Sequence, residues 1–222
     1  MDFTGPEPAD LANVNSLNHA FLVQLRAPSC GRPWRQQLSA AVQLMIKGLT
    51  DLQIGRLAAA PFLLFSLRER DADYWRVLST DDSNLDLFGA IDKDADHDQL
   101  TIAGLAFLWA LAGRNPYAAR LVSGATLSWC EQMSDCTLLR LLQLTASRGD
   151  LLQPRLAGDE GIWNKLLGPG LSSEREVRKA AHLTALQSML TEDPAAHYRP
   201  LRAAACSTWA PALRVAERKR RS

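Results

Sequence analysis

Apolar residues recur at spacings of three and four in the stretch from Gln36 to Arg68, which holds the most regular pattern in the chain. This spacing matches the 3.6-residue period of an amphipathic α-helix, so it predicts a helix with one buried stripe. The stripe consists of Leu38, Ala41, Val42, Met45 and Leu49.

A tight turn and a second helix are predicted directly after this stripe. Lys47 and Gly48 suit a helix end, because a cation favours the terminal carbonyls and glycine can adopt a positive φ. Thr50 can then accept a hydrogen bond from the first turn of the next helix. Two short helices joined by a glycine-containing elbow form a helix-turn-helix pattern. A third helix is predicted to open at Pro61, and the apolar run 62–67 places it in the core.

The second half of the chain repeats features of the first half in the same order. Arg56-Leu57 corresponds to Arg140-Leu141 at an offset of 84 residues, and Trp75 corresponds to Trp163 at an offset of 88. At the offset of 84, the stripe of the first half corresponds to Val122, Ala125, Trp129 and Met133, and the cap Leu49-Thr50-Asp51 corresponds to Met133-Ser134-Asp135. These matches predict a diverged internal duplication.

Breakers, charge runs and caps divide the chain into predicted segments. A capping box formed by Ser173 and Glu176 predicts the start of the last helix. In order, the segments are a flexible tail at 1–10, a first helical repeat at 11–80, an acidic linker at 81–98, a second helical repeat at 99–168, a C-terminal helix at 172–193 and an extension with a basic end at 194–222. The predicted fold is all-α: a helical bundle of two repeats packed as a pseudo-dimer, plus the C-terminal helix.

The acidic stretch 92–98 imitates the opening of an EF-hand calcium loop. The sixth position requires glycine and the twelfth a bidentate glutamate, but His97 and Ala103 occupy them. We therefore expect a solvated linker and no metal site.

Composition and charge favour an ordinary soluble protein. The 222 residues carry a net charge of +1, which gives no general attraction to nucleic acid or to anionic membranes. No apolar run is long enough to cross a bilayer, and the N-terminus lacks the pattern of a signal peptide, so we expect a cytoplasmic protein. The four cysteines form no C-x-x-C pair and are expected to be reduced thiols.

Residues typical of catalysis are scattered. The sequence contains no nucleophile elbow, Walker loop or dinucleotide-binding glycine motif, and its four histidines are His19, His97, His182 and His197, all far apart. The sequence therefore predicts no enzymatic activity, no cofactor and no small-molecule substrate.

At residues 38–68 the chain resembles the FlhD family of flagellar transcriptional activators. The matching features are Leu49-Thr50, Gln53, Arg56-Leu57-Ala58 and the segment from Phe65 to Arg68. The helix at 17–26 lies where the family has its dimer-forming helix, so the resemblance covers about 11–70 and extends to 97–167 through the duplication. The resemblance implies an all-α bacterial regulator that works through protein contacts. FlhD proteins are about half this length and act as dimers bound to a zinc-containing subunit, whereas here a second unit follows in the same chain.

We therefore expect a non-enzymatic regulatory or adaptor protein that acts on transcription by binding a protein partner, and that touches DNA only within a complex. A first alternative is a direct helix-turn-helix DNA-binding regulator. Its speculative DNA-contacting residues are Gln53, Arg56, Arg68, Arg70 and Arg76. A second alternative is an interaction or assembly chaperone module unrelated to transcription.

Overall fold

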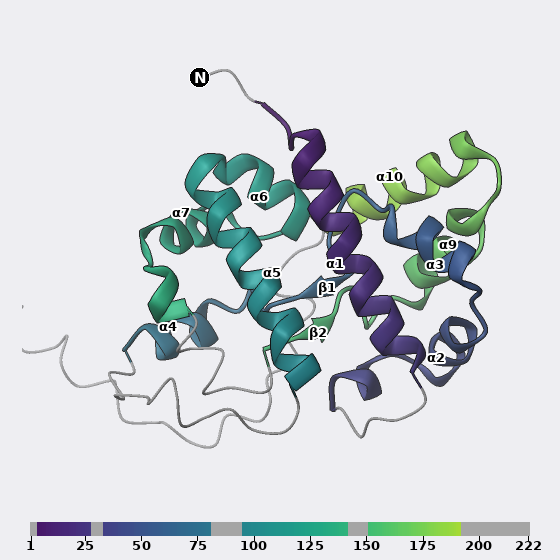
Figure 1. The fold of residues 1–222 in the computed structure, drawn as a ribbon, viewed down its shortest axis with the longest axis horizontal. Helices are drawn as coiled ribbons and strands as arrows, with labels where there is room; N and C mark the ends of the chain where they lie inside the picture. Colours follow the sequence, from purple (N-terminus) through teal and green to yellow (C-terminus); the bar gives the residue numbers. More distant parts are fainter. Residues whose placement is uncertain (1–3, 28–32, 81–94, 142–150, 192–222) are drawn as a thin grey trace, which may run out of the picture. The chain divides into compact units, whose positions relative to one another are not determined.

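Helices form most of the part of the chain that the computed structural model describes, which is residues 4–27, 33–80, 95–141 and 151–191 (Figure 1). These residues all belong to one unit, Met1–Glu192. The prediction of an all-α fold is confirmed, and none of the described helices is both long and apolar enough to cross a membrane. The helices are α1 (Pro8–Arg26), α2 (Ala40–Lys47), α3 (Asp51–Ala58), α4 (Ala72–Thr80), α5 (Ala95–Arg114), α6 (Pro116–Ser123), α7 (Leu127–Asp135), α9 (Glu160–Leu167) and α10 (Arg175–Thr191), with 3-10 turns η1 (Pro33–Gln37) and η2 (Pro169–Leu171).

Two very short strands lie between the helices. Strand β1 (Phe65–Ser66) pairs antiparallel with β2 (Gln153–Pro154). Phe65 lies opposite Pro154, and Ser66 lies opposite Gln153. This ladder joins a segment of the first half of the chain to a segment of the second half.

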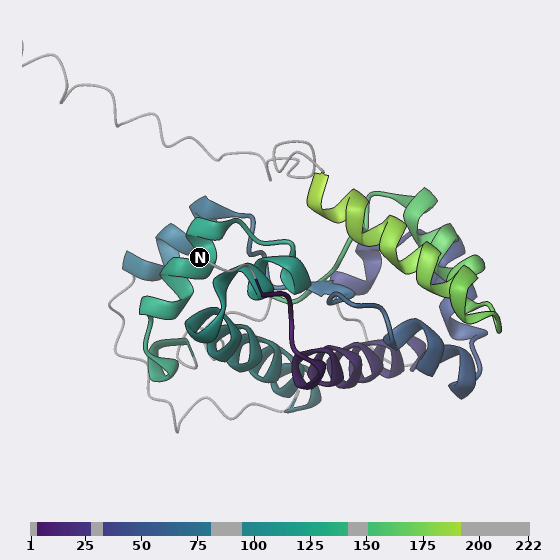
Figure 2. The ribbon, with the colours of Figure 1, turned by 90° about the horizontal axis from the view of Figure 1, so that it is seen from above.

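The long helices α1 and α5 run side by side in opposite directions (Figures 1 and 2). Asp10, in the first turn of α1, is 2% exposed and accepts a hydrogen bond of 2.6 Å from Arg114, the last residue of α5. Helix α1 begins at Pro8, inside the predicted tail, because Glu7 and Asp10 form a capping box. Helix α5 likewise begins at Ala95, inside the predicted linker. The rest of that linker, 81–94, lies outside the described residues.

The helix predicted to open at Pro61 is not present. Residues 62–65 are buried as expected, but residues 62–64 form an irregular, bent segment that leads into β1 at Phe65. The side chain of Asn18, on α1, replaces the hydrogen bonds that a helix would supply. Its Nδ2 donates to the carbonyls of Ala58 (3.2 Å) and Phe62 (2.8 Å), and its Oδ1 accepts from the N–H of Leu64 (2.8 Å).

The stripe predicted for the first helix is wrong in part. Leu38, Val42 and Leu49 are buried, but Ala41 and Met45 face solvent. Ile46, which was not in the predicted stripe, is 1% exposed. Helix α2 is apolar on two sides, so its periodicity could not identify the buried side.

The single helix predicted across 122–133 is also wrong. Gly124 adopts a φ of 66° and ends α6, and Thr126 then caps α7 by accepting from the N–H of Trp129 at 3.2 Å. Trp129 and Met133 are buried on α7, whereas Val122 is buried at the end of α6.

Similar caps and buried positions recur in the two halves of the structure 87 or 88 residues apart, whereas the predicted duplication used an offset of 84. Ser39 and Thr126 cap α2 and α7, and Thr50 and Thr137 cap α3 and a helix that begins at 138. The offset of 84 equated Thr50 with Ser134, which lies within α7. Further equivalences are the buried pairs Val14 and Thr101, Phe21 and Leu108, Val42 and Trp129, Ile46 and Met133, and Ile54 and Leu141.

The second part of each half keeps an offset of 88. Asp71 and Asp159 accept from the third backbone N–H after them, each at 3.0 Å. Arg68 and Leu156 both have positive φ, 56° and 57°. The indole N–H groups of Trp75 and Trp163 both donate to a backbone carbonyl, seven and eight residues earlier, at 3.0 Å.

The C-terminal helix α10 begins at Arg175, three residues after the predicted start. The predicted capping box of Ser173 and Glu176 does not form in the structure. Instead, the Oγ of Ser172 accepts from the N–H of Glu174 at 3.1 Å, and the carbonyl of Glu174 accepts from Arg178. The predicted end at 193 and the extension 194–222 lie outside the described residues.

Charges placed at the buried leucines should unfold the protein. Leu57→Asp and Leu141→Asp each bury an unpaired carboxylate at a position that is 0% exposed, and each should lower the free energy of unfolding by about 3 kcal/mol or more. The matched controls are Leu52→Asp and Leu139→Asp, at positions 67% and 56% exposed, which should cost no more than roughly 0.5 kcal/mol. Urea denaturation would measure the difference, and equal midpoints for a core variant and its control would contradict the core assignment.

Candidate functional site

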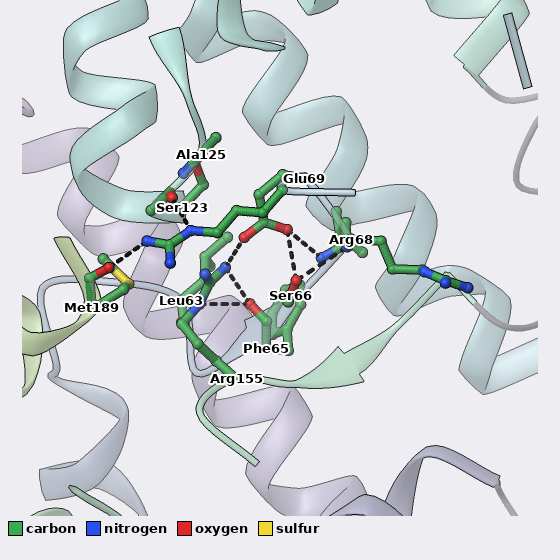
Figure 3. Close-up of polar contacts among 12 residues, drawn as sticks. Leu63, Phe65, Ser66, Arg68, Glu69, Ser123, Ala125, Arg155 and Met189 are labelled. Carbon is green, nitrogen blue, oxygen red and sulfur yellow. Dashed lines mark hydrogen bonds and ion pairs between the residues drawn. The ribbon is translucent and has the colours of Figure 1, made fainter. Parts of the chain in front are cut away.

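A buried ion pair links the two halves beside the β1–β2 ladder (Figure 3). The side chain of Glu69 is 0% exposed and that of Arg155 is 6% exposed, and Arg155 Nη2 donates to Glu69 Oε1. Arg155 also donates to the carbonyls of Leu63 (2.7 Å) and Phe65 (2.8 Å). A guanidinium has five donors in a fixed plane, so one side chain can serve a carboxylate and two carbonyls together.

The second oxygen of Glu69 completes the cluster. Oε2 accepts from the hydroxyl of Ser66 (2.8 Å) and from the N–H of Leu67 (2.7 Å). The carboxylate is therefore satisfied on both oxygens, which a buried charge requires. The partners of this carboxylate are groups of the chain itself, so the cluster holds the two halves together.

Arg70 joins the first half to the C-terminal helix. Its Nε donates to the carbonyl of Gly124 at 2.6 Å, and its Nη2 donates to the carbonyl of Met189 near the end of α10. A Cβ on Gly124 would stand only 2.9 Å from Cγ and 3.0 Å from Sδ of Met189, so this site favours glycine for space as well as for its φ.

Each of the five residues proposed for DNA contact already bonds to another group of the chain. Gln53 forms a capping box with Thr50. Arg56 donates to the carbonyl of Leu171, and Arg70 holds Gly124 and Met189 as described above. Arg68 pairs with Asp71 and lies 4.0 Å from the ring centre of Tyr74, and Arg76 pairs with Asp73 on the surface. DNA contact by these residues stays a prediction.

The described cysteines and histidines differ in exposure. Cys130 is buried, and burial raises the pKa of its thiol to about 12, which keeps it protonated and unreactive. Cys136 is half-buried and also reduced, and burial raises its pKa as well. His19 is exposed on α1, whereas His182 is 4% exposed on α10. Cys30, Cys206, His97 and His197 lie outside the residues whose side chains are described.

The most exposed large apolar side chain of the described residues is Leu44, on α2. It is 71% exposed, and Met45 beside it is 39% exposed. Ala41 and Gly48 lie one helical turn before and after them on the same side and are also exposed. We call these four residues the outer face of α2. They lie opposite Val42 and Ile46, which point into the core.

Groups that could bind a metal are not brought together: no cluster of three His, Cys, Asp or Glu side chains occurs among the described residues. Comparison of the whole chain with protein-family models, with curated proteins and with solved structures gave no match.

Sequence reasoning missed Asn18, Glu69 and Arg155. Asn18 had a visible signal, because it falls within the apolar stripe of α1, between Val14 and Phe21, where a polar side chain must find a buried partner. Glu69 and Arg155 are 86 residues apart, and no local pattern marks either of them.

Breaking the buried ion pair should destabilise the protein strongly. Arg155→Met leaves the Glu69 carboxylate buried without a counter-charge, and we expect a loss of about 3–5 kcal/mol in urea denaturation. The double variant Arg155→Met/Glu69→Gln removes the charge and should lose less than the sum of the two single variants. The control is Arg76→Met, which breaks an exposed ion pair and should leave the midpoint unchanged. A loss for Arg155→Met no larger than that of the control would contradict the role of the pair.

His182 should make stability depend on pH. Burial lowers the pKa of His182, and the backbone of Gly170 offsets only part of that shift. The unfolded chain then binds a proton at the ordinary pKa of about 6.5 while the folded chain does not, so stability should fall as the pH drops below that value. In urea denaturation at about pH 7.5 and about pH 5.5, His182→Asn should show a smaller drop than the wild type. His19→Asn is the control, because His19 is exposed, and a drop equal to that of the wild type in His182→Asn would refute the assignment.

Proposed function

We propose that this chain is a non-enzymatic regulatory or adaptor protein of the FlhD kind, which acts on transcription by binding other proteins. The observation that carries the proposal is the outer face of α2. Leu44 and Met45 place apolar area in water on a helix whose other side already fills the core. We take these two neighbouring exposed apolar side chains as the centre of an interaction surface. The resemblance of residues 38–68 to FlhD supports the same class of function.

The proposal includes an architecture of two diverged copies packed as a pseudo-dimer. Three features support it: the caps at an offset of 87, the aspartate and tryptophan pairs at an offset of 88, and the β1–β2 ladder. Shifting both members of the pair Phe65 and Pro154 by 88 positions along the chain gives the pair Gln153 and Ser66, which is the other pair of the ladder. Such a ladder is what a local twofold axis produces. The protein is further proposed to be bacterial and cytoplasmic.

Arginines proposed for DNA contact already have partners within the chain, which favours protein binding over direct DNA recognition. Releasing Arg70 for phosphate contact would remove a donor from the carbonyl of Met189, and releasing Arg68 would remove the charged partner of Asp71. Arg76 is more exposed than Arg68, the other candidate that forms an ion pair, and its Asp73 partner competes with a phosphate.

Two experiments test this function. In a pull-down from cells that naturally produce the chain, the wild type should retain a transcription component, and Leu44→Glu should lose it. Glu131→Gln is the control, because Glu131 is exposed on α7 at the position equivalent to Leu44. Retention of the same proteins by Leu44→Glu would contradict a role for this face, and a pull-down without any transcription component would favour the assembly-chaperone alternative.

Duplex DNA should not bind the isolated protein strongly. We expect no binding, or binding at low salt that disappears at moderate salt, because phosphate contacts alone are screened. Binding that survives moderate salt and is lost in Arg76→Gln would overturn the proposal in favour of a direct DNA-binding regulator.

A further inference from the structure

We propose that helix α10 is a pH-sensitive switch, whose separation from η2 and α9 is promoted when the buried side chain of His182 takes up a proton. Helix α10 packs against both of these elements. No described element follows α10 in the chain, so it can separate without displacing another one. The rest of the described residues would stay folded.

Few large apolar side chains hold α10 in place. Its buried residues are Ala181, His182, Ala185 and Met189, so only Met189 buries a long apolar side chain, and Leu186 and Leu190 are buried only in part. Helix α1, of similar length, buries four large apolar side chains, namely Val14, Phe21, Leu22 and Leu25. Apolar burial stabilises in proportion to its area, and elements with little of it open locally at a lower free energy than the whole protein. Helix α10 should therefore open before α1.

His182 lies within the contact between α10 and η2. Its side chain is 4% exposed, and a Cβ on Gly170 would lie 3.5 Å from both Cδ2 and Nε2, so η2 covers this edge of the ring. The Nε2 atom is buried, and no described group forms a hydrogen bond with it. A protonated imidazole carries an N–H donor on both nitrogens. Protonation therefore places a charged donor without an acceptor inside the contact, which opposes the closed form.

The groups around His182 do not offset this cost. The backbone of Gly170 favours the charged form, but burial opposes it more strongly, and the charge of Arg178 opposes it as well, so the pKa of His182 is lowered. The other ionisable side chains of α10 and of the elements near it are Arg175, Glu176 and Lys179 on α10, Asp159, Glu160 and Lys165 at α9, Asp51 and Arg56 on α3, and Arg70, which bonds to the far end of α10. Among these described groups, none bonds to Nε2.

Opening would expose a surface that the closed form covers. It would break the bond from Arg70 to the carbonyl of Met189 and remove the Met189 side chain from Gly124. It would also uncover the sides of η2 and α9 that face α10. The switch would thus link the pH to the exposure of this surface.

The size of the effect follows from the protonation of one histidine. In the open form His182 is solvated and titrates at the ordinary pKa of about 6.5, whereas the closed form resists protonation. Protons therefore favour the open form, and the ratio of open to closed α10 should rise by a factor of up to about ten between about pH 7.5 and about pH 5.5. Histidine is the side chain whose ordinary pKa lies in this range.

Hydrogen exchange of the full chain, followed by mass spectrometry at these two pH values, tests the proposal. After correction for the intrinsic exchange rate, peptides from α10 should lose protection at the lower pH by a factor of up to about ten. Peptides from α1 and α5 should keep their protection. This pattern distinguishes the release of α10 from a general loss of stability.

Two variants separate the charge of His182 from its shape. His182→Leu and His182→Gln cannot take up a proton, and both should keep the protection of α10 at the lower pH. The control is His19→Asn, which removes an exposed histidine and should lose protection in α10 as the wild type does. His97 and His197 remain in every variant and cannot cause a difference between them.

Three results for the wild type and the variants would overturn the proposal: unchanged protection of α10 in the wild type, an equal loss in α1 and α5, or an equal loss in His182→Leu and His182→Gln. Exposure of α10 in both variants already at about pH 7.5 would also overturn it, because the shape of the imidazole, and not its charge, would then hold the helix.

Discussion

The buried segment between Ala60 and Leu67 must satisfy its backbone polar groups without forming a helix. An unpaired buried backbone group costs about as much as a lost hydrogen bond, so each needs a partner from elsewhere. Asn18 supplies partners from α1, and Arg155 supplies them from the second half through its side chain and through its own N–H, which donates to Leu64. The N–H of Leu63 donates to the carbonyl of Val122, also in the second half. The first half of the chain is therefore not complete without the second half.

In the proposed duplication, the positions that correspond between the two halves differ according to what each position contacts. Groups whose partners lie in the same half are of the same type in both halves. Threonines cap α3 and the helix that begins at 138, and aspartates cap α4 and α9. The ion pair of Glu69 and Arg155, which joins the two halves, has no counterpart at the corresponding positions. At the offset of 88, Glu69 corresponds to Ala157, and Arg155 corresponds to Leu67. One ion pair is enough to satisfy the carbonyls of Leu63 and Phe65, and a second buried pair would add another desolvation cost without further carbonyls of this segment to satisfy.

Local sequence patterns predicted local structure well and long-range contacts poorly. The helix-turn-helix of α2 and α3, the cap at Thr50 and the burial of residues 62–65 could all be recognised, because caps and apolar runs act over a few residues. The irregular form of 62–65 could not, since it depends on Asn18 and Arg155. The predicted offset of 84 differs by three residues from the spacing of the caps, because leucine-rich helices align one turn out of register almost as well. For the candidate site, the sequence identified Gln53 and the arginines as polar groups, but it could not identify their partners within the chain.

In helix α2 the apolar pattern is ambiguous, because apolar residues lie on two of its sides. A helix that only packs against its own core needs one apolar side, and periodicity then identifies it. Leu44 and Met45 add a second apolar side, so the predicted stripe mixed core residues with exposed ones. The equivalent helix α7 has no such ambiguity, because Glu131, Gln132 and Asp135 mark its solvated side. The prediction mixed two sides of α2 because both carry apolar residues, and only the side with Val42 and Ile46 is buried.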